Sequence, residues 1–407
     1  MLVTMVMVVI MFRHIFHNDI KELSISCVKL KAKTLIIKLN TMQETLTQIK
    51  TADKLFIGMD LHKNTSTLCV KNEAGAEILS QRILTDKNAM KKFIGDIKEK
   101  STELSLVMEP VSQWYYYADL IENLGVDVHL AHPMRVKAIA AARIKTDKID
   151  AGVLADLLRT NLLPEAYFSS VDVRGWKEQC RFRASLLNLR TQVKNKIHAI
   201  LFKHALRHTF SNLFGKGGMA WMGSLKLKEP FKTNLDKYLL LVDQFTELVL
   251  QAEQMIQSTV THNPQANLLI SIPGISFCSA LTIMAEIGDI NRFNSAKKLQ
   301  GYAGLVPSTY ASGEKQVHGR ITKQGSKWLR WIMIEAAYHQ ERCKKIPGFG
   351  SYYLSIKKRR GTKTAAVATA RKLLAVVWRL LKDNRPYEVT APHCWKSGTL
   401  APKLSSI

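Results

Sequence analysis

The chain has 407 residues, of which 59 are Lys or Arg and 33 are Asp or Glu, so its formal net charge is +26. This length allows two or three domains, and so large a positive surplus indicates an anionic macromolecule as partner. No apolar run reaches the roughly 18–20 residues that cross a bilayer, which excludes a membrane-spanning protein and favours nucleic acid over a membrane surface.

Two further features of the composition narrow the class of protein. The six cysteines are scattered singly with no CxxC pair, which argues against a zinc site and favours free thiols in a reducing cytosol. The apolar start, Met1 to Phe12, lacks the basic region and small-residue cleavage site of a secretory signal. We interpret residues 1–53 as an extension, either disordered or upstream of a true start near Met42, because periodic patterning begins only near Lys54.

Residues 54–170 predict an α/β domain. Short β-branched and alternating runs predict strands, and apolar residues at three- and four-residue spacing predict helices. The predicted strands are Lys54–Asp60, Thr65–Lys71, Ala76–Ile83, Glu103–Glu109 and Val126–Leu130, and the predicted helices are Asp86–Lys100, Gln113–Leu124 and a last one ending at Arg159. Pro133 is expected to break the chain before that last helix. The order β-β-β-α-β-α-β-α is that of the ribonuclease H-like fold, a mixed sheet with helices on both faces.

Four acidic residues fall where this fold would gather them. Asp60 ends the first predicted strand, Glu109 ends the fourth, and Asp147 and Asp150 stand three apart on one face of the last helix. Carboxylates meeting at one rim are tolerable when they share divalent cations. The alternative is that the strand-end acids are ordinary polar residues and that the helix acids complement the helix dipole. Basic residues beside the helix acids (Arg143, Lys145 and Lys148) would attract a polyanion.

Residues 171–262 are interpreted as a helical linker. Apolar residues recur at helical spacing between many Arg and Lys, with a glycine-rich break at Gly215 to Gly218. Two long helices joined by a loop would form either an antiparallel or intermolecular coiled coil, or a plain intramolecular helix pair, and the pattern fits both.

Residues 263–385 predict a mostly α-helical C-terminal domain, followed by an irregular tail at 386–407. A Pro-Gly-Ile turn containing Gly274 lies between two predicted helices and suggests a helix-hairpin-helix, whose backbone N–H groups can hold a phosphate. A polar, glycine-punctuated loop follows, with Ser308 and Ser312. The basic residues at and after this loop are candidates for phosphate contacts: Lys315, Arg320, Lys323, Lys327 and Arg330. A loop serine is more often part of turn chemistry than a nucleophile.

The motifs FIGMDLHK, VMEP, RIKTDKIDAGVLADLLR, IPGIS and GLVPSTYASGEKQVHGRITKQGSKWLR occur in this order. Together they resemble the transposases of the insertion sequence 110 group, including the 1111 subgroup and the Piv-type DNA invertases. The resemblance implies a RuvC-like domain whose Asp-Glu-Asp-Asp tetrad falls on Asp60, Glu109, Asp147 and Asp150. It also implies a C-terminal transposase domain with a nucleophilic serine at Ser312. Ser308 fits less well, because it follows a proline and does not precede a glycine.

The resemblance further implies recombination of an insertion sequence with Mg²⁺ (or Mn²⁺) and a covalent phosphoserine. The implied partners are double-stranded DNA of the element ends and target, a structured bridge RNA, and a homo-oligomer (dimer or tetramer) in the cytoplasm at the nucleoid. Two other functions stay open: a metal-dependent resolvase-like nuclease that uses water as nucleophile, and a nucleic-acid-binding protein without catalysis.

Overall fold

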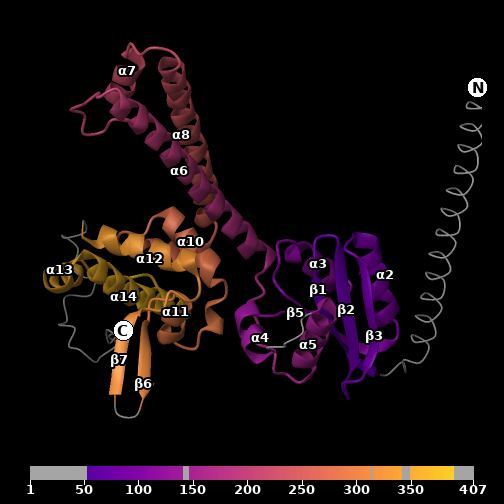
Figure 1. Ribbon diagram of the computed structural model, residues 1–407. Coiled ribbons are helices and arrows are strands. Elements are labelled where there is room, and N and C mark those ends of the chain that lie inside the picture. Colours follow the sequence, from indigo (N-terminus) through magenta and orange to yellow (C-terminus); the bar gives the residue numbers. More distant parts are fainter. Residues whose placement is uncertain (1–52, 141–145, 313–314, 342–348, 389–407) are drawn as a thin grey trace, which may run out of the picture. The chain divides into compact units, whose positions relative to one another are not determined.

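The computed structural model describes residues 53–140, 146–312, 315–341 and 349–388, and the chain divides into two compact units between Phe168 and Ser169 (Figure 1). The division of the second unit at residues 262 and 385 stays a prediction. No helix in the described ranges is long and apolar enough to cross a membrane.

The first unit is built on a five-stranded sheet with strand order β3-β2-β1-β4-β5. Its strands are β1 (Asp53–Leu61), β2 (Thr65–Asn72), β3 (Glu77–Leu84), β4 (Ser101–Met108) and β5 (Asp127–Leu130). The first three strands form an antiparallel meander, whereas β4 runs parallel to β1 and β5 parallel to β4. The mixed sheet and the succession of strands and helices along the chain are those predicted for a ribonuclease H-like domain, whereas the order of the strands across the sheet comes from the structure.

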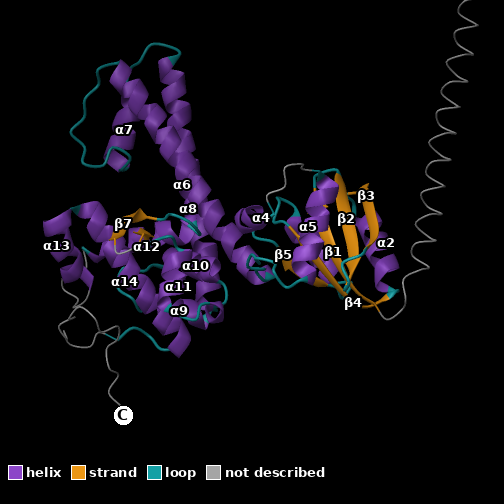
Figure 2. Cartoon of the chain, turned by 60° about the horizontal axis from the view of Figure 1, so that its bottom comes forward, coloured by secondary structure: helices purple, strands orange, loops and turns teal. Residues whose placement is uncertain are grey.

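One face of the sheet is covered by α2 (Lys87–Lys98) and α3 (Trp114–Glu122), whose apolar side chains share one core with the strands. Figure 2 shows α2 and α5 (Asp147–Arg159) on opposite sides of the sheet. Alternate residues of β1 point into this core, as period-2 side-chain direction requires: Leu55, Ile57 and Met59 are fully buried there. Helix α2 begins at an Asp86 cap, whose side chain accepts from two backbone N–H groups. Its apolar stripe completes the same core.

The opposite face is covered by α5 (Asp147–Arg159), which packs unusually close to β1. A Cβ atom on Gly58 would lie 1.9 Å from the Ala151 carbonyl oxygen and 2.6 Å from the Ala155 nitrogen. Only glycine permits this approach of helix backbone to strand backbone. A salt bridge between Lys71 of β2 and Asp156 of α5 holds the helix on the same face. The short helix α4 (Pro133–Ile139) precedes it.

In the second unit two long helices, α6 (Val171–Lys203) and α8 (Phe231–Thr261), pack against each other, with α7 (Lys216–Ser224) between them in the chain. Arg183 pairs with Glu253, and Arg190 donates to Thr246. Residue numbers rise on one helix as they fall on the other, so the pair is antiparallel. The described chain therefore forms an intramolecular helix pair, which was one of the two predicted arrangements.

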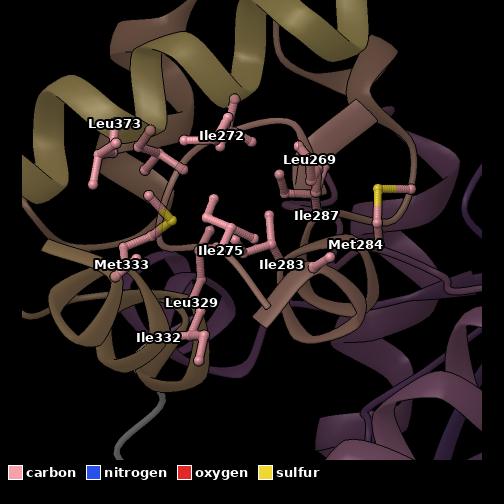
Figure 3. Close-up of a cluster of buried hydrophobic side chains, with 14 of the residues drawn as sticks. Leu269, Ile272, Ile275, Ile283, Met284, Ile287, Leu329, Ile332, Met333 and Leu373 are labelled. Carbon is pink, nitrogen blue, oxygen red and sulfur yellow. The ribbon is translucent and has the colours of Figure 1, made fainter. Parts of the chain in front are cut away.

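The remaining helices of this unit pack around one large apolar core, with a smaller apolar cluster between the last two of them. They are α9 (Pro264–Ile270), α10 (Phe277–Ile287), the short 3₁₀ helix η1 (Ile290–Arg292), α11 (Ala296–Tyr302), α12 (Lys327–Gln340), α13 (Phe349–Arg360) and α14 (Thr362–Asp383). Figure 3 shows how Leu269 of α9, Ile283 of α10, Met333 of α12 and Leu373 of α14 converge in this core.

Three sequence predictions for local structure were wrong. The predicted polar loop at 307–321 is a hairpin of two antiparallel strands, β6 (Pro307–Ser312) and β7 (Lys315–Ile321). Its polar strands lack the apolar alternation that marks a buried strand. The predicted glycine-rich break begins α7, with Gly215 as its N-cap. Pro133 begins α4 at the first helical position, where its missing N–H costs nothing.

Two helices joined by a short turn are present where the helix-hairpin-helix was predicted. Helices α9 and α10 pack together around a turn in which Gly274 has φ +86°. A Cβ atom there would lie 2.8 Å from the Gln340 Nε2 atom at the end of α12. One side of the turn therefore faces its own core, and the geometry does not establish a DNA-binding module.

Candidate active site

The candidate site is built at the end of β1, on the face that α5 covers. Asp60 pairs with Thr67 across the antiparallel ladder, so its backbone is held within the sheet. It stands two residues after Gly58, and alternate residues share a face, so its side chain points toward α5. The Asp60 side chain is only 20% exposed. The close approach of helix to strand at Gly58 therefore determines what lies beside this carboxylate.

The first turn of α5 brings a second acid to the same place. Thr146 caps the helix by accepting from the Ile149 N–H at 3.3 Å, and Asp147 is the first helical residue. His62 lies between the two acids: its Nε2 atom is 3.0 Å from Asp60 Oδ2 and 3.8 Å from Asp147 Oδ1. Residues 60 and 147 are thus joined through one imidazole.

The other two predicted acids start from backbone positions next to these two. Met59 of β1 pairs with Met108 of β4, so Asp60 and Glu109 are the next residues of two adjacent parallel strands. Such neighbours lie about 5 Å apart along the hydrogen-bonding direction. Asp150 stands one turn after Asp147 and is half-buried, and its negative charge acts on Asp60.

Burial raises the pKa of the Asp60 carboxyl above its usual range. His62 opposes this rise, and the carboxylates of Asp147 and Asp150 add to it. Partial burial and the neighbouring carboxylates thus disfavour the ionised form of Asp60. A divalent cation would relieve the same repulsion, which is the usual reason for such a group of acids to persist.

The donor set fits a divalent metal. Among the residues that the structure describes, Asp60, His62 and Asp147 place one ligand atom each within 4.8 Å of one another. Ligands about 2.1 Å from an octahedral ion lie about 3 Å apart when adjacent and about 4 Å apart when opposite. The distances from the His62 Nε2 atom to the two carboxylates, 3.0 and 3.8 Å, fall within these separations.

Two residues of this rim were missed by the sequence predictions. His62 stands within the motif FIGMDLHK but was given no role, although its two-residue spacing from Asp60 already places both on one side of the strand. Arg82 of β3 lies with a guanidinium nitrogen 3.9 Å from Asp147 Oδ2, and its Nε atom donates to Thr65 Oγ1 at 3.0 Å. No local sequence pattern links Arg82 to an acid of α5, because only the folded sheet brings them together.

The predicted serine lies in the second unit. Ser312 is the last residue of β6, and its backbone pairs with that of Lys315 on β7, next to the turn of the hairpin. Ser308 lies lower on the same strand, and its hydroxyl donates to the Arg320 carbonyl at 3.0 Å. The Ser308 hydroxyl thus makes a contact within the hairpin, and the choice of Ser312 stays a prediction.

Of the three basic residues predicted beside the helix acids, the structure describes only one. Arg143 and Lys145 lie outside the described residues. Lys148 is exposed and pairs with Glu77 at 2.8 Å, so in this structure its charge is directed along the surface of β3.

The basic residues predicted near the serine are mostly exposed. Arg320 lies on β7, Lys323 follows it with φ +55°, and Lys327 begins α12; all three are exposed. Arg330 differs, because its Nη1 atom donates to the Ala303 carbonyl at 3.0 Å and ties α12 to the end of α11. Arg330 therefore has a structural role, and its predicted contact with phosphate stays a prediction.

Comparison with known proteins now adds to this geometry. A family model described as "Transposase IS116/IS110/IS902 family" matches residues 266–354, and a DEDD transposase model of the IS110 group matches residues 57–205. The chain is 25% identical over 350 residues to the transposase for insertion sequence element IS1111A of Coxiella burnetii, covering 83% of this chain and 93% of that protein.

Two further relatives agree with this match. A probable family 20 transposase of Pseudomonas aeruginosa is 26% identical over 293 residues, 69% of this chain and 85% of that protein. The pilin gene-inverting protein of Moraxella bovis is 24% identical over 343 residues, 82% of this chain and 98% of that protein. The first family model covers the hairpin with Ser312, and the second covers all four rim acids. The chain belongs to the IS110/IS1111 family of DNA-recombining transposases.

Proposed function

We propose that this protein cleaves and exchanges the DNA strands of an insertion sequence by using the acidic rim and Ser312 together. The observation that carries the proposal is the convergence of Asp60 and Asp147 on one imidazole at 3.0 and 3.8 Å, in a segment that matches a DEDD transposase model. Glu109 and Asp150 complete the proposed tetrad. We also propose the division into segments 54–170, 171–262 and 263–385.

The roles of the rim residues follow from their chemistry. Asp60, Glu109, Asp147 and Asp150 would hold Mg²⁺ or Mn²⁺, which when bound supplies charge neutralisation at a scissile phosphate. Asp60 is more buried than Asp147, and Arg82 lies close enough to Asp147 to add a positive charge beside its carboxylate. The acids are held on a strand and on a helix whose backbones touch, so their positions are set before DNA arrives.

The serine step balances without an external energy source. The Ser312 oxygen forms a bond to phosphorus, and the bond from phosphorus to the 3′ oxygen breaks. The serine proton leaves, the 3′ oxygen takes up a proton, and the strand end stays attached as a phosphoserine. Reversal of the step on another strand end restores the DNA and the free serine. The exposed Arg320, Lys323 and Lys327 would hold the flanking phosphates.

The proposed partners are element-end and target DNA, a bridge RNA and further copies of this chain in the cytoplasm at the nucleoid. The net charge of +26 supports nucleic-acid binding. Exposed apolar residues at seven-residue spacing, Leu241, Leu248 and Met255 on α8, support a coiled-coil contact between copies, because they lie outside the seam with α6. Phe182 and Leu189 repeat this spacing on α6.

A DNA-capture experiment tests the serine chemistry. Element-end DNA labelled at its 3′ end is incubated with the protein and Mg²⁺, and the products are denatured and separated by size. The proposal expects label that migrates with the protein and is removed by phosphodiesterase. Cleavage without labelled protein would favour a resolvase-like nuclease with water as nucleophile. Binding without cleavage would favour a nucleic-acid-binding protein.

The guide is tested by sequencing the RNA that copurifies with the protein. A discrete transcript from beside its own gene would support a bridge RNA. Random cellular RNA would overturn this part of the proposal and leave the cleavage chemistry unaffected.

A further inference from the structure

His62 is the residue of the acidic rim that stands outside the proposed tetrad. It follows β1 directly, and its backbone carbonyl accepts from the Gln113 side-chain amide at 2.7 Å. Its side chain is 53% exposed, yet its Nε2 atom points back between Asp60 and Asp147. This half-exposed imidazole thus lies between two acids that are 87 residues apart in the chain.

The two carboxylates present the geometry that a nitrogen ligand requires. Asp147 directs Oδ1 toward His62 and Oδ2 toward Arg82, so the guanidinium and the imidazole share the two oxygens of one carboxylate. Asp60 directs Oδ2 toward the same imidazole nitrogen. Two oxygens and one nitrogen therefore lie within 4.8 Å of one another, with the Arg82 guanidinium beside the second oxygen of Asp147.

We infer that the His62 Nε2 atom is a ligand of the divalent metal, and that it makes the site prefer Mn²⁺ to Mg²⁺. This inference rests on the proposed metal site. Mg²⁺ favours oxygen ligands and keeps its waters, whereas first-row transition ions accept imidazole readily. Mn²⁺ combines acceptance of imidazole with affinity for carboxylate oxygen, which matches a set of two aspartates and one histidine.

The alternative role for His62 is a charge partner that a metal displaces. The two roles make opposite predictions for the variant without the imidazole. If His62 is a ligand, its removal weakens Mn²⁺ binding more than Mg²⁺ binding. If His62 only neutralises the acids, its removal leaves Mn²⁺ binding unchanged or makes it tighter, because the metal no longer competes with an imidazole.

The test measures metal binding by the full chain without DNA. Mn²⁺ affinity is measured from the paramagnetic resonance signal of the free ion, and Mg²⁺ affinity by competition, for the wild type and for His62→Ala. The expected result is a fall in Mn²⁺ affinity of about tenfold or more, with a distinctly smaller fall for Mg²⁺. Equal falls for both ions, or no fall for Mn²⁺, would overturn the inference.

A spectroscopic readout detects the nitrogen directly. Electron spin echo modulation of bound Mn²⁺ is expected to show coupling to an imidazole ¹⁴N nucleus in the wild type and to lose it in His62→Ala. His62→Asn, which keeps a polar side chain, is the second variant if His62→Ala does not fold. A wild-type spectrum with no nitrogen coupling would exclude His62 as a ligand.

His129→Ala is the matched control. His129 also contacts two carboxylates, with Nδ1 2.8 Å from Glu165 and Nε2 2.9 Å from Asp127, but it belongs to β5, outside the acidic rim. Its substitution is expected to leave the Mn²⁺-to-Mg²⁺ ratio unchanged. Failure of the metal site itself would look different: Mn²⁺ binding would be absent in the wild type or would persist in Asp147→Asn.

Discussion

The acidic rim of the first unit and the hairpin of the second unit are built in opposite ways. The rim depends on long-range contacts, because Asp60 and Asp147 meet only where α5 touches β1 at Gly58. The hairpin is local, since Ser312 and Lys315 pair across a turn within the same short segment. The rim has a half-buried carboxylate at its centre, whereas the hairpin carries exposed basic residues.

In the proposed reaction the rim binds the metal and the hairpin carries the nucleophile, and the difference in construction suits these two roles. Metal ligands need fixed positions, and a strand and helix in backbone contact provide them. A nucleophile that attacks one DNA strand and is later released needs access, and a strand end beside a turn provides it. The four predictions below test this contrast, and they are ordered from the largest expected effect to the smallest.

Ser312→Ala should have the largest effect. Loss of the nucleophile is expected to lower strand cleavage by more than about 10⁴-fold and to remove the protein-bound DNA label, while metal binding at the rim stays intact. The measurement is the labelled-DNA capture described above. Ser308→Ala is the matched control on the same strand, and it should cleave within a fewfold of wild type. Equal activity of Ser312→Ala and wild type would rule out serine catalysis.

Asp147→Asn tests the rim. Removal of one ligand charge is expected to lower metal-dependent cleavage by about 10³-fold, because several kcal/mol of charge stabilisation are lost. Cleavage is measured with Mg²⁺, with Mn²⁺ and with chelator. Asp127→Asn, at an exposed acid of β5, should behave as wild type. If the wild type cleaved equally well with metal and with chelator, and Asp147→Asn cleaved as well as the wild type, catalysis by the tetrad would be contradicted.

Gly58→Ala tests whether the helix contact builds the rim. A Cβ atom 1.9 Å from the Ala151 oxygen must push α5 away, at a cost of about 1–3 kcal/mol in the free energy of unfolding. Metal affinity should fall with it, because α5 carries Asp147. Gly95→Ala in α2 is the control, since nothing lies within 4 Å of the added atom. It should gain up to about 1 kcal/mol in urea unfolding. Unchanged metal affinity in Gly58→Ala would separate the rim from the helix contact.

Asp60→Asn tests the electrostatics of the rim through thermal stability without metal, and this change in melting temperature is the smallest effect expected. Because burial raises the pKa of Asp60, the folded chain holds this proton more tightly than the unfolded chain, and ionisation opposes folding. In chelator at neutral pH the variant should therefore melt about a degree or two higher than wild type.

The higher melting temperature of Asp60→Asn should depend on pH in one direction. The gain should appear as pH rises from the ordinary value of 3.8 through the raised pKa, and it should vanish below 3.8. With Mn²⁺ added, the wild type should melt at the higher temperature, since only the wild type keeps the Asp60 carboxylate as a ligand. A gain of equal size at low and neutral pH would show that burial of the charge is not its cause.

Much of the first unit was predictable from residue order alone. Alternation along β1 and helical spacing in α2 are local patterns, and they predicted the order of elements found in the sheet. The motif containing Asp147 and Asp150 also placed both acids in the first turn of a helix. The sequence predicted the hairpin less well, because its strands are polar on both faces and lack the apolar period by which a strand is recognised.

The sequence by itself predicted the mixed α/β sheet of the first unit and the family to which the chain belongs, and it singled out four acids as candidates for the site. The tertiary structure alone decided that His62 and Arg82 accompany Asp147, and that Gly58 is the point where α5 meets β1. The physical reason is distance along the chain: local periodicity reports which face a side chain occupies, whereas contacts between residues 58, 62, 82, 147 and 151 exist only after the sheet and helix have packed.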